Sequence, residues 1–124
     1  MTLLLVIVAG GLGSGARYLV GQWAFSAIGP QFPYGTVIVN ILGCFSLGFV
    51  AQLATMGTLS QEARIAIGTG FLGGFTTYSS FNQETIAMFS GGATGAAISN
   101  IAITLAGGLA AGLLGAAAGR MFQS

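Results

Sequence analysis

The chain has 124 residues, of which 54% are hydrophobic and only 4% charged, and its mean hydropathy is +0.89. Soluble domains carry about 25% charged residues, so a water-soluble monomer is excluded, and three Arg without Lys exclude nucleic-acid binding, because a run of phosphates needs more cations. The absence of His and the single Cys exclude zinc sites, His-based acid–base catalysis and internal disulfides, so we expect a small integral membrane protein and not an enzyme.

The first two apolar segments are each long enough for a membrane helix, which needs about 20 residues. The first covers about 3–27 and is followed by Pro30 and Pro33, which stop a helix. Only Met1 and Thr2 precede it, without the basic residues typical of a signal peptide, so we expect this span to remain in the mature protein. The second covers about 35–56 and contains no charge.

The remaining chain predicts two further spans. Ser60 is a plausible N-cap for a third segment over about 61–89, with Glu62 in the first turn, where the helix dipole favours an anion. After Gly91 and Gly92, a fourth span covers about 93–122. The short connections leave no room for a second domain. We therefore predict a single all-α transmembrane domain over residues 1–124 with four transmembrane helices.

The third segment is expected to be broken in mid-membrane. Four glycines within 68–74 precede a polar run over 76–84, and each glycine inside a helix costs about 1 kcal/mol relative to Ala. A break frees carbonyls from one half-helix and N–H groups from the other, which is tolerated at membrane depth only inside protein or beside water. Freed carbonyls suit a small cation, and half-helix N-termini suit an anion.

Glycine is unusually frequent, at 22 residues, and many glycines lie four apart. This spacing places small residues on one helix face and allows close helix approach in lipid. So much contact surface on four short helices predicts packing against a partner chain. The spaced pairs are Gly11/Gly15, Gly70/Gly74, Gly91/Gly95, Gly108/Gly112 and Gly115/Gly119.

The charges leave the membrane orientation open. Four spans place both termini and the connection near 57–60 on one side, with Arg64 and Arg120, while Arg17 lies toward the other end of the first span. Two cations against one is a weak positive-inside signal. Two alternatives remain: insertion in both orientations, which permits an antiparallel homodimer resembling the inverted repeats of larger transporters, or one fixed orientation.

Polar side chains lie in pairs within the apolar spans. Thr36 and Asn40 are one helical turn apart, as are Asn100 and Thr104, so each pair shares a helix face. Such residues either hydrogen-bond between helices or line a polar path, and for the two Asn both interpretations stay open. In the third segment, Tyr78 and Phe81 are three apart, and the positive edges of their rings could meet an anion.

Three motifs resemble the Fluc (CrcB-type) fluoride channels. They are GGLGSGARY at 10–18, GTVIVN at 35–40 followed by Gly43, and GFLGGFTTYSSFNQE at 70–84. The resemblance covers essentially the whole chain and implies an antiparallel, dual-topology homodimer in membrane lipid. It also implies that the protein passively exports toxic cytoplasmic fluoride through two pores across the plasma membrane (the bacterial inner membrane).

The resemblance also implies residue roles. Gly73 and Thr76 match positions whose carbonyls, from both subunits, hold a central structural sodium ion, and Arg17 matches an arginine near the pore vestibule. Tyr78 departs from the usual Phe, and Gly108 stands where a hydroxyl is common. The residues expected to line the fluoride pore are Asn40, Thr77, Tyr78, Ser80, Phe81, Asn100 and Thr104.

Rival functions need features that this chain lacks. A selective path for tightly hydrated fluoride needs hydrogen-bond donors without a fixed charge that would trap the ion, and the polar residues supply them. A small multidrug exporter needs a carboxylate embedded in the membrane, and the first span has none. A purely structural assembly does not explain glycines beside clustered hydroxyls. A fluoride/proton exchanger would show pH-driven uptake, and only Glu84 is placed for a proton cycle, so a passive channel is favoured.

Overall fold

The protein is entirely helical in its computed structural model, which describes residues 1–122, so the last two residues of the predicted domain lie outside the described part. This confirms the predicted fold class at the level of secondary structure. Three long helices accompany a third segment that is divided into short pieces. The elements are α1 (Thr2–Ala27), α2 (Tyr34–Thr55), α3 (Gln61–Arg64), η1 (Ile65–Leu72), α4 (Gly73–Phe75), α5 (Tyr78–Ser90) and α6 (Thr94–Arg120).

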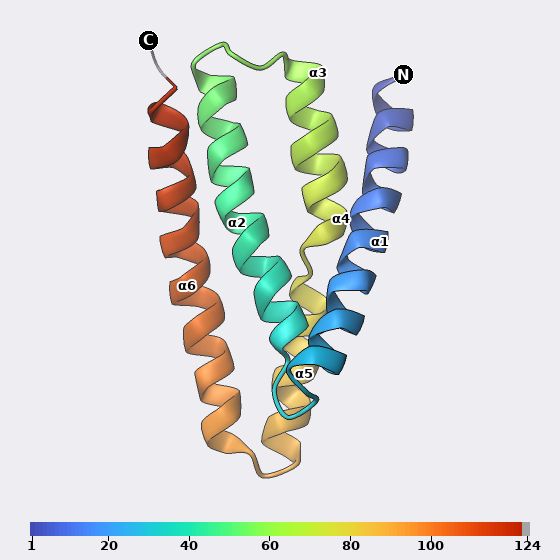
Figure 1. The fold of residues 1–124 in the computed structure, drawn as a ribbon, viewed down its shortest axis with the longest axis vertical. Coiled ribbons are helices and arrows are strands. Elements are labelled where there is room, and N and C mark those ends of the chain that lie inside the picture. The colour runs from blue at the N-terminus through green and yellow to red at the C-terminus, as the bar shows by residue number, and fades with distance from the viewer. Residues whose placement is uncertain (123–124) are drawn as a thin grey trace.

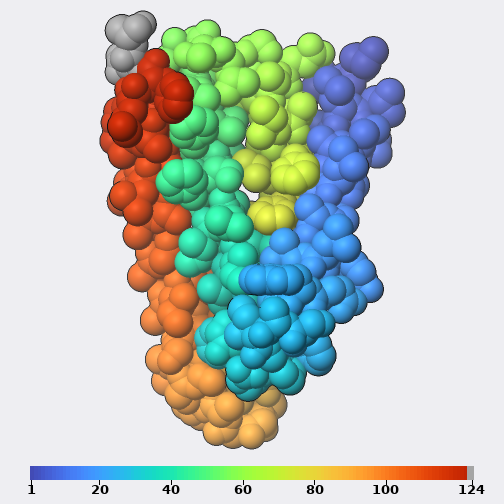
Figure 2. Space-filling view, in the orientation of Figure 1, coloured from blue at the N-terminus to red at the C-terminus, as the bar shows by residue number. Residues whose placement is uncertain are grey.

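The helices run up and down beside one another, with the N-terminus, the α2–α3 turn and the end of α6 at one end of the molecule (Figure 1). α2 packs along α6, and α1 packs along η1 and α4, while α5 contacts α6. On the face shown in Figure 2, α2 lies between α6 and the third segment. A small core of Val39, Leu72 and Phe75 joins α2 to the third segment.

Three helices, α1, α2 and α6, are long and apolar enough to cross a membrane by length and composition. Their large apolar side chains point outward, as Leu12, Leu109 and Leu113 do. Such exposure fits lipid or a partner chain as the surrounding medium. The third segment contains no single helix of that length, because the chain leaves the helical conformation at Thr76 and Thr77.

The glycines of the third segment do not themselves interrupt the helix. Gly68 and Gly70 lie in η1, a stretch of wider π-helical turns, and Gly73 and Gly74 lie in α4. The left-handed glycines are instead Gly29, Gly57 and Gly92, which belong to the three connections between long segments. The chain leaves the helix two residues after these glycines, at Thr76 and Thr77, at the start of the polar run that follows them.

Close packing explains several of these glycines. A Cβ added at Gly74 would overlap the Gly10 carbonyl oxygen, and one at Gly70 would lie 2.8 Å from the Ala9 Cβ. At Gly13 of α1, an added Cβ would overlap the Phe71 carbonyl oxygen. The backbones of α1 and the third segment thus touch, as the four-residue spacing of Gly70 and Gly74 predicts. At Gly15 of α1, in contrast, an added Cβ would meet no atom of the other described helices within 4 Å.

The substitution Gly13→Ala should lower the thermal stability of the purified protein. The added methyl group forces α1 away from η1, and overpacking of this kind costs about 1–3 kcal/mol. The measurement is the unfolding midpoint in detergent, with Gly15→Ala as the matched control on the same helix. Equal midpoints for the two variants would contradict the packing seen between α1 and η1.

Candidate functional site

The site is organised around two extended residues, Thr76 and Thr77, between α4 and α5. Thr76 has φ −84° and ψ 157°, and Thr77 has φ −151° and ψ 112°. The Thr76 N–H still donates to the Leu72 carbonyl at 3.0 Å, so the helical pattern of α4 ends there. The next N–H, from Thr77, would reach the Gly73 carbonyl in a continuous helix but donates to Asn40 Oδ1 at 2.8 Å.

Asn40 of α2 holds the interruption with both halves of its amide. While Oδ1 accepts from the Thr77 N–H, Nδ2 donates to the Thr77 carbonyl at 3.1 Å. Backbone groups released from a helix in an apolar interior need such partners, because an unpaired one costs several kcal/mol. Asn40 thus hydrogen-bonds between helices, one of the two interpretations that the sequence left open, and its pore-lining role stays a prediction.

α5 begins at this point with a side-chain cap. Thr77 is its N-cap, and its Oγ1 accepts from the Ser80 N–H at 3.2 Å. Thr77 Oγ1 also donates to Ser80 Oγ at 3.1 Å. Because the Ser80 N–H is directed to the cap, the Thr76 carbonyl loses the donor that a continuous helix would supply. Thr77 and Ser80, both predicted site residues, thus lie together at the start of α5.

Arg17 contacts the opposite side of the interruption. Its Nε donates to the Gly74 carbonyl at 3.1 Å, and the side chain is half-buried between α1 and α4. A cation at the C-terminal end of a helical stretch is favoured by the helix dipole. The resemblance implied a position near a pore vestibule for Arg17, which stays a prediction, and it did not indicate this hydrogen bond to backbone.

A groove of about 400 Å³ opens over the interruption between α2, the third segment and α6. The Tyr78 and Phe81 rings meet at its wall with centroids 5.7 Å apart and planes at 61°. Tyr78 is 75% exposed, whereas Phe81 is only 7% exposed. The lining residues that the sequence singled out are Asn40, Gly73, Thr76, Thr77, Tyr78, Phe81, Thr104 and Gly108.

Asn100 lies behind this groove and not on its wall. The side chain is 1% exposed, and Nδ2 donates to Thr85 Oγ1 at 2.9 Å. Thr104, one turn along α6, donates to Asn100 Oδ1 at 3.4 Å. The sequence analysis missed Thr85, although it lies one turn after Phe81 and so shares a helix face with that ring. The pore-lining role of Asn100 stays a prediction.

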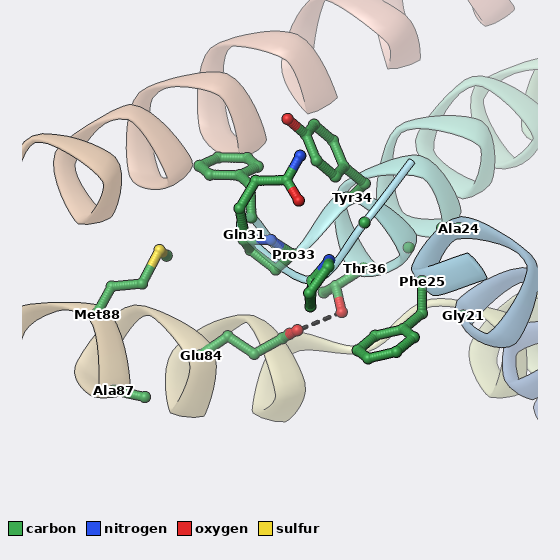
Figure 3. Close-up of a pocket in the computed structure, with 14 residues that line it drawn as sticks. Gly21, Ala24, Phe25, Gln31, Pro33, Tyr34, Thr36, Glu84, Ala87 and Met88 are labelled. Atoms are coloured by element: carbon green, nitrogen blue, oxygen red, sulfur yellow. Dashed lines mark hydrogen bonds between the residues drawn. The ribbon is translucent and has the colours of Figure 1, made fainter. Parts of the chain in front are cut away.

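A second cavity, of about 380 Å³, lies where the α1–α2 connection meets α5. Figure 3 shows Thr36 and Glu84 facing each other at its edge, where Thr36 Oγ1 donates to Glu84 Oε1 at 2.7 Å. Thr36 and Asn40, on one face of α2, therefore both contact the third segment. Among residues 1–122, no three His, Cys, Asp or Glu side chains lie close enough to hold a metal ion.

The family model for CrcB-like proteins (Camphor Resistance, CrcB) matches residues 4–116 of this chain. This chain belongs to the CrcB family. Proteins named fluoride-specific ion channel FluC are similar to it: one from Rhizobium etli is 51% identical over 72% of both chains. Another, from Sorangium cellulosum, is 46% identical over 87% of this chain and 86% of the relative.

Similarity to the CrcB family extends along nearly the whole chain. A fluoride-specific ion channel FluC from Chloroflexus aurantiacus is 39% identical over 97% of this chain and 96% of its own. The resemblance stated from the three sequence motifs is thereby confirmed. The family is one of ion channels and not of enzymes. With three helices able to span a bilayer, this CrcB-family chain is a membrane protein.

The substitution Asn40→Ala should destabilise the protein, because it removes the side chain that bonds the backbone at the helix interruption. It leaves the buried Thr77 N–H without a partner, at a cost of about 1–3 kcal/mol, and removes one of the donors to the Thr77 carbonyl, which as the N-cap carbonyl also accepts from α5. The thermal unfolding midpoint tests this, with Asn82→Ala as the control, because Asn82 is exposed on α5. An Asn40→Ala midpoint equal to that of the control would show that the interruption does not depend on the amide.

Proposed function

We propose that this protein is a fluoride-selective channel that passively exports toxic cytoplasmic fluoride across the plasma membrane (the bacterial inner membrane). The observation that carries the proposal is the groove at the helix interruption, whose polar walls include Asn40, Thr77 and Thr104. Membership of the CrcB family and the names of its fluoride-channel relatives support it.

The chemistry of the groove suits a small, strongly hydrated anion. A path for fluoride must replace the hydration shell with donors yet release the ion. The described lining residues carry no charged side chain, so the ion would meet hydroxyl and amide groups and the positive edges of the Tyr78 and Phe81 rings. The residues proposed for the fluoride path are Asn40, Thr77, Tyr78, Ser80, Phe81, Asn100 and Thr104.

The assembly is proposed to be an antiparallel homodimer with two pores in membrane lipid. In one chain the groove lies open, and Leu105 and Leu109 at its rim are 53% and 74% exposed. A second copy would cover these side chains and close each groove into a pore. The weak bias between Arg17 at one end and Arg64 with Arg120 at the other permits both orientations. In this arrangement the third segment would also cross the membrane, which gives four spans in all, and its interruption would lie at mid-membrane.

A structural sodium ion fits the interruption. The Gly73 and Thr76 carbonyls lose their helical donors because the Thr77 N–H turns to Asn40 and the Ser80 N–H turns to the Thr77 hydroxyl. Carbonyls released at a broken membrane helix are suitable ligands for sodium. In a homodimer, two carbonyls from each subunit would hold the ion and tie the interruptions together. Arg17 is proposed to lie near the pore vestibule, where its hydrogen bond to the Gly74 carbonyl stabilises the α4 side of the interruption.

Fluoride efflux from liposomes tests the function directly. Purified protein should release fluoride quickly when valinomycin carries the compensating potassium, and chloride should stay inside in a parallel assay. A fluoride electrode records the release. Release driven by a pH gradient without valinomycin would indicate a fluoride/proton exchanger instead, and no release from folded dimers would contradict the proposed function.

The substitution Phe81→Ile should cut fluoride throughput at least about tenfold, because it removes a ring edge that a largely dehydrated anion has no water to replace. The same efflux assay measures it, with dimer content checked by size-exclusion chromatography. Phe89→Ile is the matched control, because Phe89 lies on α5 away from the groove and is 43% exposed. Unchanged throughput in Phe81→Ile would make this ring a packing residue only.

Dual orientation predicts labelling at both ends of the molecule from outside intact cells. The α2–α3 and α5–α6 connections lie at opposite ends of the bundle (Figure 1), and they contain Thr58 and Ala93 respectively. The substitutions Thr58→Cys and Ala93→Cys are each made in a Cys44→Ala background. A membrane-impermeant maleimide should label part of each population. Complete labelling of one variant and none of the other would establish a fixed orientation and exclude the antiparallel dimer.

A further inference from the structure

Asn100 is the most buried polar side chain of the described chain, at 1% exposure, and it is hydrogen-bonded to Thr104, which lines the groove. A buried primary amide has two N–H donors and an oxygen acceptor to satisfy, and leaving one unpaired costs about 1–3 kcal/mol. Asn100 makes one hydrogen bond from each end of the amide: Nδ2 donates to Thr85 of α5, and Oδ1 accepts from Thr104 of its own helix. The amide therefore joins α5 to α6 at the level of the groove.

The donor and acceptor of each hydrogen bond around Asn100 can be assigned, starting from the Phe81 carbonyl at one end of the chain of bonds. The Phe81 carbonyl can only accept, so the Thr85 hydroxyl donates its single proton to it, at 2.7 Å. Thr85 Oγ1 must then accept from Asn100, which places Nδ2 toward α5 at 2.9 Å. The amide oxygen is left facing Thr104, whose hydroxyl donates to it at 3.4 Å.

This arrangement determines what Thr104 offers to the groove. With its proton directed at Asn100, the Thr104 hydroxyl turns lone pairs toward the groove, which disfavours an anion. At 3.4 Å, however, that hydrogen bond is at the long end of the accepted range and therefore weak. The hydroxyl can turn its proton to an anion in the groove and return it to the amide when the anion leaves.

On the basis of the proposed fluoride channel, we propose that Thr85 and Asn100 are positioning residues that control fluoride affinity through Thr104. The Asn100 oxygen competes with fluoride for the Thr104 proton, which weakens binding enough to permit release. The Thr85 hydroxyl holds the amide in the orientation that makes this competition possible. Asn100 therefore contributes to the proposed fluoride path indirectly, through the Thr104 hydroxyl that lines the groove.

The test measures fluoride efflux from liposomes as a function of fluoride concentration. Asn100→Leu removes the competing oxygen, so half-maximal flux should occur at about fivefold lower fluoride, the effect of one weak hydrogen bond. Adding Thr104→Val to Asn100→Leu should abolish that shift, because no proton remains to be released. Ser99→Ala is the control, since Ser99 is exposed on the same helix.

A second pair of variants keeps the test sharp if Asn100→Leu folds poorly. Thr85→Val is nearly the same shape but leaves the amide free to turn, and it should shift the half-maximal concentration in the same direction. Thr85→Ser retains the hydroxyl and should match the wild type. Unfolding midpoints separate a stability effect from a change in affinity.

The outcomes distinguish this inference from the proposed function. If the wild type conducts fluoride while Thr85→Val and Asn100→Leu keep its half-maximal concentration, the positioning role is overturned, even where the unfolding midpoint falls. If the shift persists without the Thr104 hydroxyl, the competition is overturned. If the wild-type protein releases no fluoride, the proposed function fails and this inference with it.

Discussion

The pair of hydrogen bonds between the Asn40 amide and the Thr77 backbone is the constraint on which the rest of the site depends. An interrupted helix exposes polar backbone groups, and in an apolar interior each unpaired group costs several kcal/mol. One primary amide satisfies both the N–H and the carbonyl of Thr77, at 2.8 and 3.1 Å. Neither Asp nor Leu offers both a donor and an acceptor in this arrangement, so among these three side chains only the amide makes both bonds.

Further contacts of the third segment follow from that first pair. With Thr77 extended, its side chain can cap α5, and the Gly73 and Thr76 carbonyls are released from helical bonding. Arg17 bonds the neighbouring Gly74 carbonyl from α1. The polar groups at the interruption thus come from α1, α2 and the third segment, so its geometry depends on how these three parts pack together. The glycines allow that packing, because α1 approaches the third segment closely enough to exclude a Cβ at Gly13 or Gly74.

The polar residues on the two faces of α5 make different contacts. On the side of α2, the start of α5 supplies Thr77 and the exposed Tyr78 to the groove. On the side of α6, Thr85 turns inward to Asn100. A fluoride path needs hydrogen-bond donors that bind the ion well enough for it to enter but weakly enough for it to leave. A hydrogen-bonded layer behind the groove would meet that demand without adding charge to a membrane interior, where charge is costly.

Composition and periodicity by themselves determined the helical class, the membrane location and the approximate ends of the long helices, because these depend on local hydropathy and on turn residues. They also placed Asn40, Tyr78 and Phe81 on helix faces. Only the tertiary structure decided that the chain leaves the helix at Thr76 and not at the glycines, that Arg17 bonds the Gly74 carbonyl, and that Asn100 is buried against Thr85. Those outcomes depend on which backbone groups and side chains meet between helices distant in sequence, and no local pattern contains that information.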